Sequence, residues 1–204
     1  MCLNDVPFFT SIVNYVHYCA AKGLNNIEAP SLEMSLKNII CSYAICGFSI
    51  GVIFLDNQFK CIKHRNQVGI LINLVSKGKN RKLIECFYRL IKEHCRCHYT
   101  TLPYDSLPRM MVVHLMITVI FYINTFVWKS GTSKILSPLT ILEGIMLDYN
   151  LHFRVIFSEF VQTYEGTRDD MIARTVDPLA LGPNRNLQGG IRCFSLVTGY
   201  VLQQ

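Results

Sequence analysis

The chain has 204 residues, half of them apolar and only 17% charged, which excludes a disordered protein and allows a sizeable hydrophobic core. A formal net charge of +6 and a pI near 8.8 are compatible with an anionic partner such as nucleic acid, although many unspecialised proteins are equally basic. Most of the positive excess lies between Lys60 and Arg96.

The nine cysteines are scattered and form no CxxC pair. The first residues include Asn4 and Asp5 instead of a basic start followed by an apolar run, so no signal peptide is expected. Reduced thiols in the nucleus or the cytoplasm, and no secretion, fit this pattern. The run His94-Cys95-Arg96-Cys97-His98 suggests zinc at first, but neighbours one and three apart on a helix do not converge on one ion, so zinc is disfavoured.

The first half of the chain predicts strands and helices in the order of a ribonuclease-H-like α/β fold. The chain is expected to begin with a strand fragment and a turn at Asn4-Asp5, followed by two strands joined by a turn at Asn14-Tyr15. A helix from the N-cap Ser31 to Gly47 at C′ follows, and then a strand that ends at Asp56. The last expected elements of this half are a short basic helix or turn over 59–69, a strand over 70–76 and a helix over 81–98. Three antiparallel strands followed by parallel additions, with flanking helices, are typical of that mixed sheet.

The segment "MMVVHLMITVIFYINTFVW", residues 110–128, is long enough to span a bilayer. However, it contains four polar side chains, His114, Thr118, Asn124 and Thr125. A Gly-rich segment of the kind that ends helices in soluble proteins follows it. A central core helix is therefore favoured over a membrane span, and no membrane partner is expected.

The last quarter of the chain predicts a small β module. "RVIFSEFVQTYE", "PLALGPNRNLQGG" and "IRCFSLVTGYVL" read as short strands separated by Gly, Pro and Asn turns, a barrel or a piece of one. Residues 1–150 are therefore assigned to the α/β core and residues 151–204 to the β module.

Two acids are candidates for chemistry. The buried-looking run Val52–Leu55 ends in Asp56, which either stops the strand as a turn-former or marks the strand end where α/β sheets place ligands. Glu85, on the helix over 81–98, is either a surface ion-pair partner of neighbouring arginines or a second carboxylate facing Asp56. Paired carboxylates bind Mg²⁺ through oxygen, but any chain of this length offers many acid pairs.

Several stretches resemble the integrase region of copia-type retrotransposon polyproteins, in the form found in diatoms and other algae. They are "NDVPFFTSI", "LDNQFK", "IECFYRLIKEHCR", "TLPYDSLPRMMV", "LSPLTILEGIMLDYNLH" and "ARTVDPLALGPNRNLQGGIRCFSLVTG", in the family's order. The resemblance covers almost the whole chain, and its last motif is the most specific. It implies a ribonuclease-H-like catalytic core followed by an SH3-like β module.

The resemblance also implies site residues. Asp56 and Glu85 match the second and third catalytic acids, which would hold Mg²⁺ or Mn²⁺, and DNA would be the partner, with multimers as the working state. The basic residues of this region are the candidates for contacts with DNA phosphates: Lys60, Lys63, His64, Arg65, Lys79, Arg81, Lys82, Arg89 and Lys92.

The chain departs from the family at its start. The family's first catalytic Asp lies just upstream of the segment that begins here with Met1, and Asp5 falls in a turn. We therefore expect a truncated polyprotein fragment, with the β module cut short at Gln204 and without strand-transfer activity. The alternatives are a non-catalytic remnant that binds nucleic acid or protein, and a small membrane protein with a span over 110–128.

Overall fold

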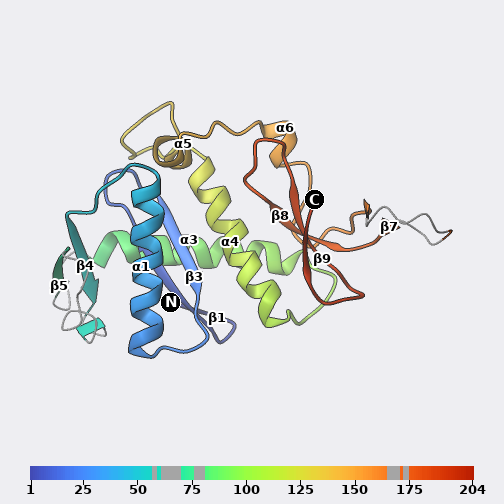
Figure 1. The fold of residues 1–204 in the computed structure, drawn as a ribbon, viewed down its shortest axis with the longest axis horizontal. Helices are drawn as coiled ribbons and strands as arrows, with labels where there is room; N and C mark the ends of the chain where they lie inside the picture. The colour runs from blue at the N-terminus through green and yellow to red at the C-terminus, as the bar shows by residue number, and fades with distance from the viewer. Residues whose placement is uncertain (57–58, 61–69, 76–80, 165–170, 172–174) are drawn as a thin grey trace.

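The computed structural model describes residues 1–56, 59–60, 70–75, 81–164, 171 and 175–204. A small antiparallel sheet lies between helix α1 on one face and helices α3 and α4 on the other (Figure 1). The elements of the chain up to α4 are β1 (Cys2–Leu3), β2 (Val6–Ile12), β3 (Cys19–Gly23), α1 (Ala29–Ile45), β4 (Val52–Asp56), β5 (Leu71–Val75), α3 (Arg81–Thr100) and α4 (Arg109–Thr125). The predicted order of strands and helices is confirmed, while residues 61–69 of the predicted short helix lie outside the described residues.

The local signals for chain reversal are confirmed. Asn4 and Asp5 both adopt positive φ, 43° and 59°, as the two central residues of a tight hairpin turn require. Gly47 has a φ of 81° directly after α1, and the N–H of the following Phe48 donates to the carbonyl of Tyr43 at 3.0 Å, which closes the helix end.

The predicted start of α1 is wrong by three residues. The helix begins at Ala29 with Glu28 in the N-cap position, where no side chain caps it, and not after Ser31. Pro30 lies in the first turn, where its missing N–H costs nothing and its fixed φ suits the helix. Proline geometry therefore outweighs the capping preference of serine at this end.

Alternation along β2 builds two cores. Val6 and Phe8 pack with α3 and α4 on one face of the sheet, whereas Phe9 packs with α1 on the other. Strands β1, β2 and β3 pair in that order, and both ladders are antiparallel.

Strands β4 and β5 pair in parallel as a separate two-stranded sheet, with Asp56 opposite Val75. Leu55 and Ile72 turn into the core beside α1, while Phe54 is 58% exposed on the other face. Within the described residues, the predicted single mixed sheet therefore consists of two sheets.

Helix α4 is a core helix, as predicted. Its fully buried residues include Met116 and Phe121, and two of its polar side chains are bonded inside the protein: the Thr118 hydroxyl donates to the carbonyl of Leu181, and the Asn124 amide bonds to Cys19. A third, His114, has a buried Nδ1 without a hydrogen-bond partner among the described residues. No helix in the described part of the chain is long and apolar enough to cross a membrane.

Short elements follow α4: α5 (Pro138–Glu143), α6 (Tyr149–His152), β6 (Thr163–Tyr164), β7 (Thr175–Val176), β8 (Leu179–Pro183), β9 (Ile191–Phe194) and β10 (Val201–Gln203). The last three strands form an antiparallel sheet in the order β10-β9-β8, and Leu181 at its centre packs into the core built by α3 and α4. The predicted strands of the second and third stretches are present as β8, β9 and β10, whereas the described part of the first stretch, "RVIFSEFVQTYE", is a strand only at Thr163–Tyr164. The SH3-like form and the boundary at residue 150 stay predictions.

His114 on α4, near β9 of this sheet, is expected to make the stability of the fold depend on pH. Burial, and secondly the charge of Arg192 on β9, lower the pKa of His114 from 6.5 to about 4. The folded chain therefore keeps this imidazole neutral between pH 6.5 and 4, while the unfolded chain takes up its proton. We expect stability to fall as the pH drops through this window, and to be unaffected by His114 above it.

Urea unfolding at pH 7, 6 and 5 tests this expectation, with His114→Gln as the comparison. The variant should lose less stability between pH 7 and pH 5 than the natural chain, because it has no imidazole to protonate. Equal losses in the two proteins would contradict the assignment.

Candidate functional site

Tyr88 ties helix α3 to the three-stranded sheet. The Thr10 hydroxyl of β2 donates to the Tyr88 hydroxyl oxygen at 2.9 Å. Burial raises the pKa of Tyr88, whereas the hydrogen bond from Thr10 lowers it. Tyr88 lies three positions after Glu85 on the same helix.

The two predicted carboxylates differ in their surroundings. Asp56 is half-buried at the carboxyl end of β4, directly after the buried Leu55. Glu85 is exposed in the second turn of α3. The assignment of both as catalytic and metal-binding residues stays a prediction.

Sequence reasoning missed Tyr88 and Thr10 as polar members of this region. Phe87 and Tyr88 are neighbours on α3; the structure buries Phe87, whereas the Tyr88 hydroxyl accepts a hydrogen bond from Thr10. The sequence signal for this difference was the adjacency of the two aromatic residues, because only one of two neighbouring positions on a helix can face the protein core.

The predicted basic residues lie partly outside the described residues, namely Lys63, His64, Arg65 and Lys79. Among the others, Lys60, Lys82 and Arg89 are exposed and Lys92 is half-buried. Arg81 begins α3, although its side chain is not among those described. Their role in binding nucleic acid stays a prediction.

The Cys- and His-rich run at the end of α3 is divided between core and surface. Cys95 is buried, and burial raises the pKa of its thiol to about 12, whereas His94 and Cys97 are exposed. Among the described residues, no three His, Cys, Asp or Glu side chains are grouped so that they could hold a metal ion.

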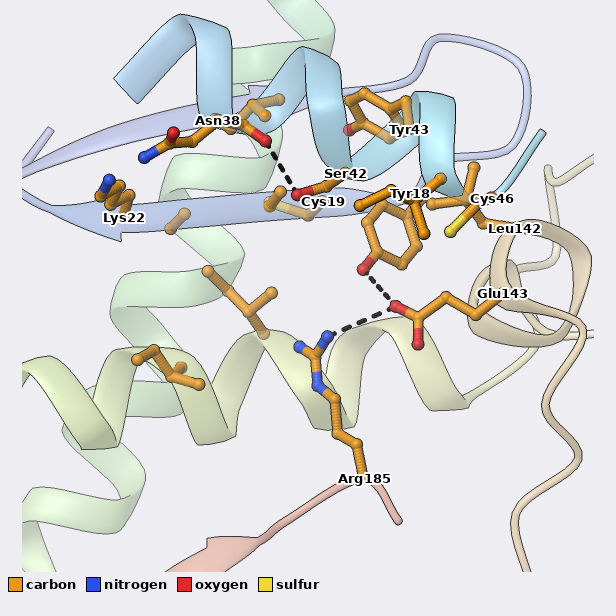
Figure 2. Close-up of a pocket in the computed structure, with 16 residues that line it drawn as sticks. Tyr18, Cys19, Lys22, Asn38, Ser42, Tyr43, Cys46, Leu142, Glu143 and Arg185 are labelled. Carbon is orange, nitrogen blue, oxygen red and sulfur yellow. Dashed lines mark hydrogen bonds and ion pairs between the residues drawn. The ribbon is translucent and has the colours of Figure 1, made fainter. Parts of the chain in front are cut away.

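A second site lies along strand β3, between α1 and α4 (Figure 2). It is a groove with a volume of about 450 Å³. Its floor has two small residues, Ala20 and Ala21, and its walls are apolar on α4 and partly polar on α1. Such a volume and such a mixed lining are typical of binding pockets.

Three residues from distant segments close one end of this groove. The Tyr18 hydroxyl donates to Glu143 Oε1 at 2.7 Å, and Arg185 Nη1 lies 3.3 Å from the same oxygen (Figure 2). The Arg185 guanidinium also lies 5.7 Å from the ring centroid of Phe121, a cation–π distance. Sequence reasoning gave no signal for this cluster, because its members are separated by 125 and 42 positions along the chain.

Burial is the main influence on how the two tyrosines that line the groove, Tyr18 and Tyr43, titrate. Burial and, to a smaller extent, Glu143 raise the pKa of Tyr18, while the charge of Arg185 lowers it; burial also raises the pKa of Tyr43 to about 12. Both phenols therefore stay protonated throughout the physiological pH range, and the Tyr18 hydroxyl donates to Glu143.

No family model and no curated protein matches this sequence. Two solved structures are similar to this chain. The catalytic core domain of BIV integrase is 13% identical, with 68% of this chain and 86% of that chain covered and a TM-score of 0.48. A chain of the simian T-cell lymphotropic virus intasome in complex with PP2A regulatory subunit B56 gamma is 12% identical, with 98% of this chain and 70% of that chain covered and a TM-score of 0.51.

At 12% identity, the likeness to the intasome chain concerns the fold alone. It confirms the predicted fold class at the level of a mixed α/β, integrase-like arrangement, and it extends over nearly the whole length of this chain.

Proposed function

We propose that this protein is an integrase-derived nucleic-acid-binding protein, a fragment of a copia-type retrotransposon polyprotein without strand-transfer activity of its own. The observation that carries the proposal is the integrase-like fold over 98% of the chain. The family motifs read from the sequence support it independently, because they occur in the family's order along the same length.

The position of Asp56 supports a relationship with metal-dependent polynucleotidyl transferases. It ends a parallel strand, and strand ends of this kind are where α/β folds place ligands, while Glu85 lies on helix α3. The two carboxylates offer oxygen donors, which fit Mg²⁺ or Mn²⁺. When bound, such an ion would stabilise the charge that develops on the phosphate oxygens during transfer. Tyr88 would help to orient this region, because its hydroxyl is anchored to Thr10.

DNA binding is the first test. Lys82 and Arg89 are exposed on α3 and their positive charges attract phosphate, so Lys82→Glu together with Arg89→Glu should weaken binding to duplex DNA about tenfold or more and lower the slope of log affinity against log salt by about 2. Fluorescence anisotropy at a series of salt concentrations measures both quantities.

Lys129→Glu together with Lys134→Glu is the matched control, since it reverses the same amount of charge on an exposed loop. This control should retain more affinity than the α3 variant. If both variants weaken binding equally, the attraction comes from net charge alone, and if the natural chain does not bind DNA at low salt, the proposed function is wrong.

Strand transfer is the second test. We expect none from residues 1–204, because none of the strands β1, β2 and β3 carries an acid to complete the set with Asp56 and Glu85. A strand-transfer assay with labelled oligonucleotide and target DNA, in Mg²⁺ and in Mn²⁺, measures it. Joined products that disappear in Asp56→Asn would overturn the proposal of an inactive fragment, whereas DNA binding that is unchanged in Asp56→Asn supports it.

A further inference from the structure

Strand β3 is the last strand of its sheet, and the ladder shows which of its residues face away from β2. The pairs Val13–Tyr18 and Pro7–Leu24 are both hydrogen-bonded, at 2.9 and 2.8 Å. Hydrogen-bonded and non-bonded pairs alternate in an antiparallel ladder, so every second residue between these two pairs directs its main-chain N–H and C=O away from β2. These residues are Cys19, Ala21 and Gly23.

The first of these outward-facing residues is already paired. The Cys19 N–H donates to Asn124 Oδ1 at 2.9 Å, and Asn124 Nδ2 donates to the Cys19 carbonyl at 2.7 Å. The carboxamide of Asn124 thus makes the two hydrogen bonds that a peptide group of a neighbouring strand would make. Beyond it, the side chain of Val113 lies against Gly23.

Ala21 lies between these two covered positions, and the groove of about 450 Å³ opens there. In the described part of the chain, no hydrogen bond satisfies its outward N–H and C=O. Ile39 of α1 and Ile117 of α4 stand on the two sides, and Figure 2 shows the strand running along the groove between the two helices. The groove therefore offers a strand edge with apolar walls.

The charges around the groove indicate the kind of partner. Arg185 is neutralised by Glu143 at the closed end. Lys22 at the other end is exposed and has no ion-pair partner among the described residues, so the groove retains one uncompensated positive charge. A carboxylate near Lys22 would complement it.

We propose that the groove binds an extended peptide segment, which adds a short strand to the edge of β3 at Ala21. The main chain of the peptide donates to and accepts from Ala21, a β-branched or other apolar side chain fills the space between Ile39 and Ile117, and an acidic side chain pairs with Lys22. Recognition of this type takes affinity from main-chain hydrogen bonds and specificity from the pockets beside them. The proposal does not depend on nucleic-acid binding.

Amide hydrogen exchange, read by NMR on the whole chain, tests the proposal directly. In the free protein the Ala21 amide should exchange faster than those of Ala20 and Lys22, which are bonded to β2. Addition of acetyl-Val-Ile-Val-Glu-amide should slow exchange at Ala21 about tenfold. The same peptide N-methylated at its two central residues should give no protection, because it cannot pair with a strand edge.

Lys22→Glu should weaken binding of the acidic peptide several-fold, whereas the exposed control Lys134→Glu should not. Equal binding of the N-methylated peptide would overturn the proposal, since apolar contact alone would then explain binding. Protection of Ala21 without peptide, together with a dimer in sedimentation, would mean that a second copy occupies the edge and would also overturn it. So would the absence of binding at millimolar peptide.

Discussion

Replacement of Asn124 by alanine is expected to lower the free energy of unfolding by about 2–4 kcal/mol. The side chain is fully buried, and it alone satisfies the outward N–H and C=O of Cys19. Alanine removes both partners and leaves two buried main-chain groups without hydrogen bonds, each of which costs roughly 1–3 kcal/mol. Urea unfolding followed by circular dichroism measures the change.

Asn38→Ala is the control, because this asparagine is exposed on α1 and its replacement should change stability by less than about 0.5 kcal/mol. Asn124→Asp gives a sharper comparison: it keeps an acceptor for the Cys19 N–H but cannot donate to the carbonyl when ionised. If Asn124→Ala were as stable as the natural chain, the amide would not be needed to cover the edge of β3.

Gly182→Ala is expected to destabilise the chain by about 3 kcal/mol or more. Gly182 has a φ of 108°, which a residue with a Cβ adopts at a substantial cost. A Cβ at this position would also lie 2.5 Å from Oγ1 and 2.8 Å from Cγ2 of Thr118, inside the packed contact between β8 and α4. Thermal and urea unfolding should both show the loss.

Gly51→Ala separates these causes from the general effect of adding a methyl group. Gly51 has no positive φ and no atom within 4 Å of the added Cβ, so its replacement should be close to neutral. In the double variant Gly182→Ala, Thr118→Ala, the two closest contacts disappear, but the Cβ of residue 118 at 3.2 Å and the positive φ remain, so we expect partial recovery. A neutral Gly182→Ala would show that β8 can move away from α4 at little cost.

The order of strands and helices could be predicted from the sequence, because that order depends on local patterns. The turn at Asn4-Asp5 and the end of α1 at Gly47 depend on backbone conformations that few residues adopt, so both could be predicted. The start of α1 could not, since Pro30 and Ser31 sent competing local signals. Polar residues such as Thr118 and Asn124 likewise identified α4 as a core helix, because a helix in lipid would leave them without partners.

Asp56 and Glu85 could be named as candidate acids from sequence, since strand-end acids and helical acids have recognisable patterns. The hydrogen bond between Tyr88 and Thr10, 78 positions away, depends on tertiary packing and could not be predicted from the sequence. The burial of Phe87 in place of its neighbour Tyr88 likewise depends on packing.

The groove along β3 belongs wholly to the tertiary structure. The residues at its floor, Ala20 and Ala21, have small side chains. Whether small side chains leave an open groove or are covered depends on where the helices on either side pack. The same holds for Asn124: its sequence position shows a polar residue in an apolar helix, while its partner, Cys19, lies 105 positions away. Local chemistry thus determines which elements form, and only their packing determines which main-chain groups are covered and which remain open to a partner.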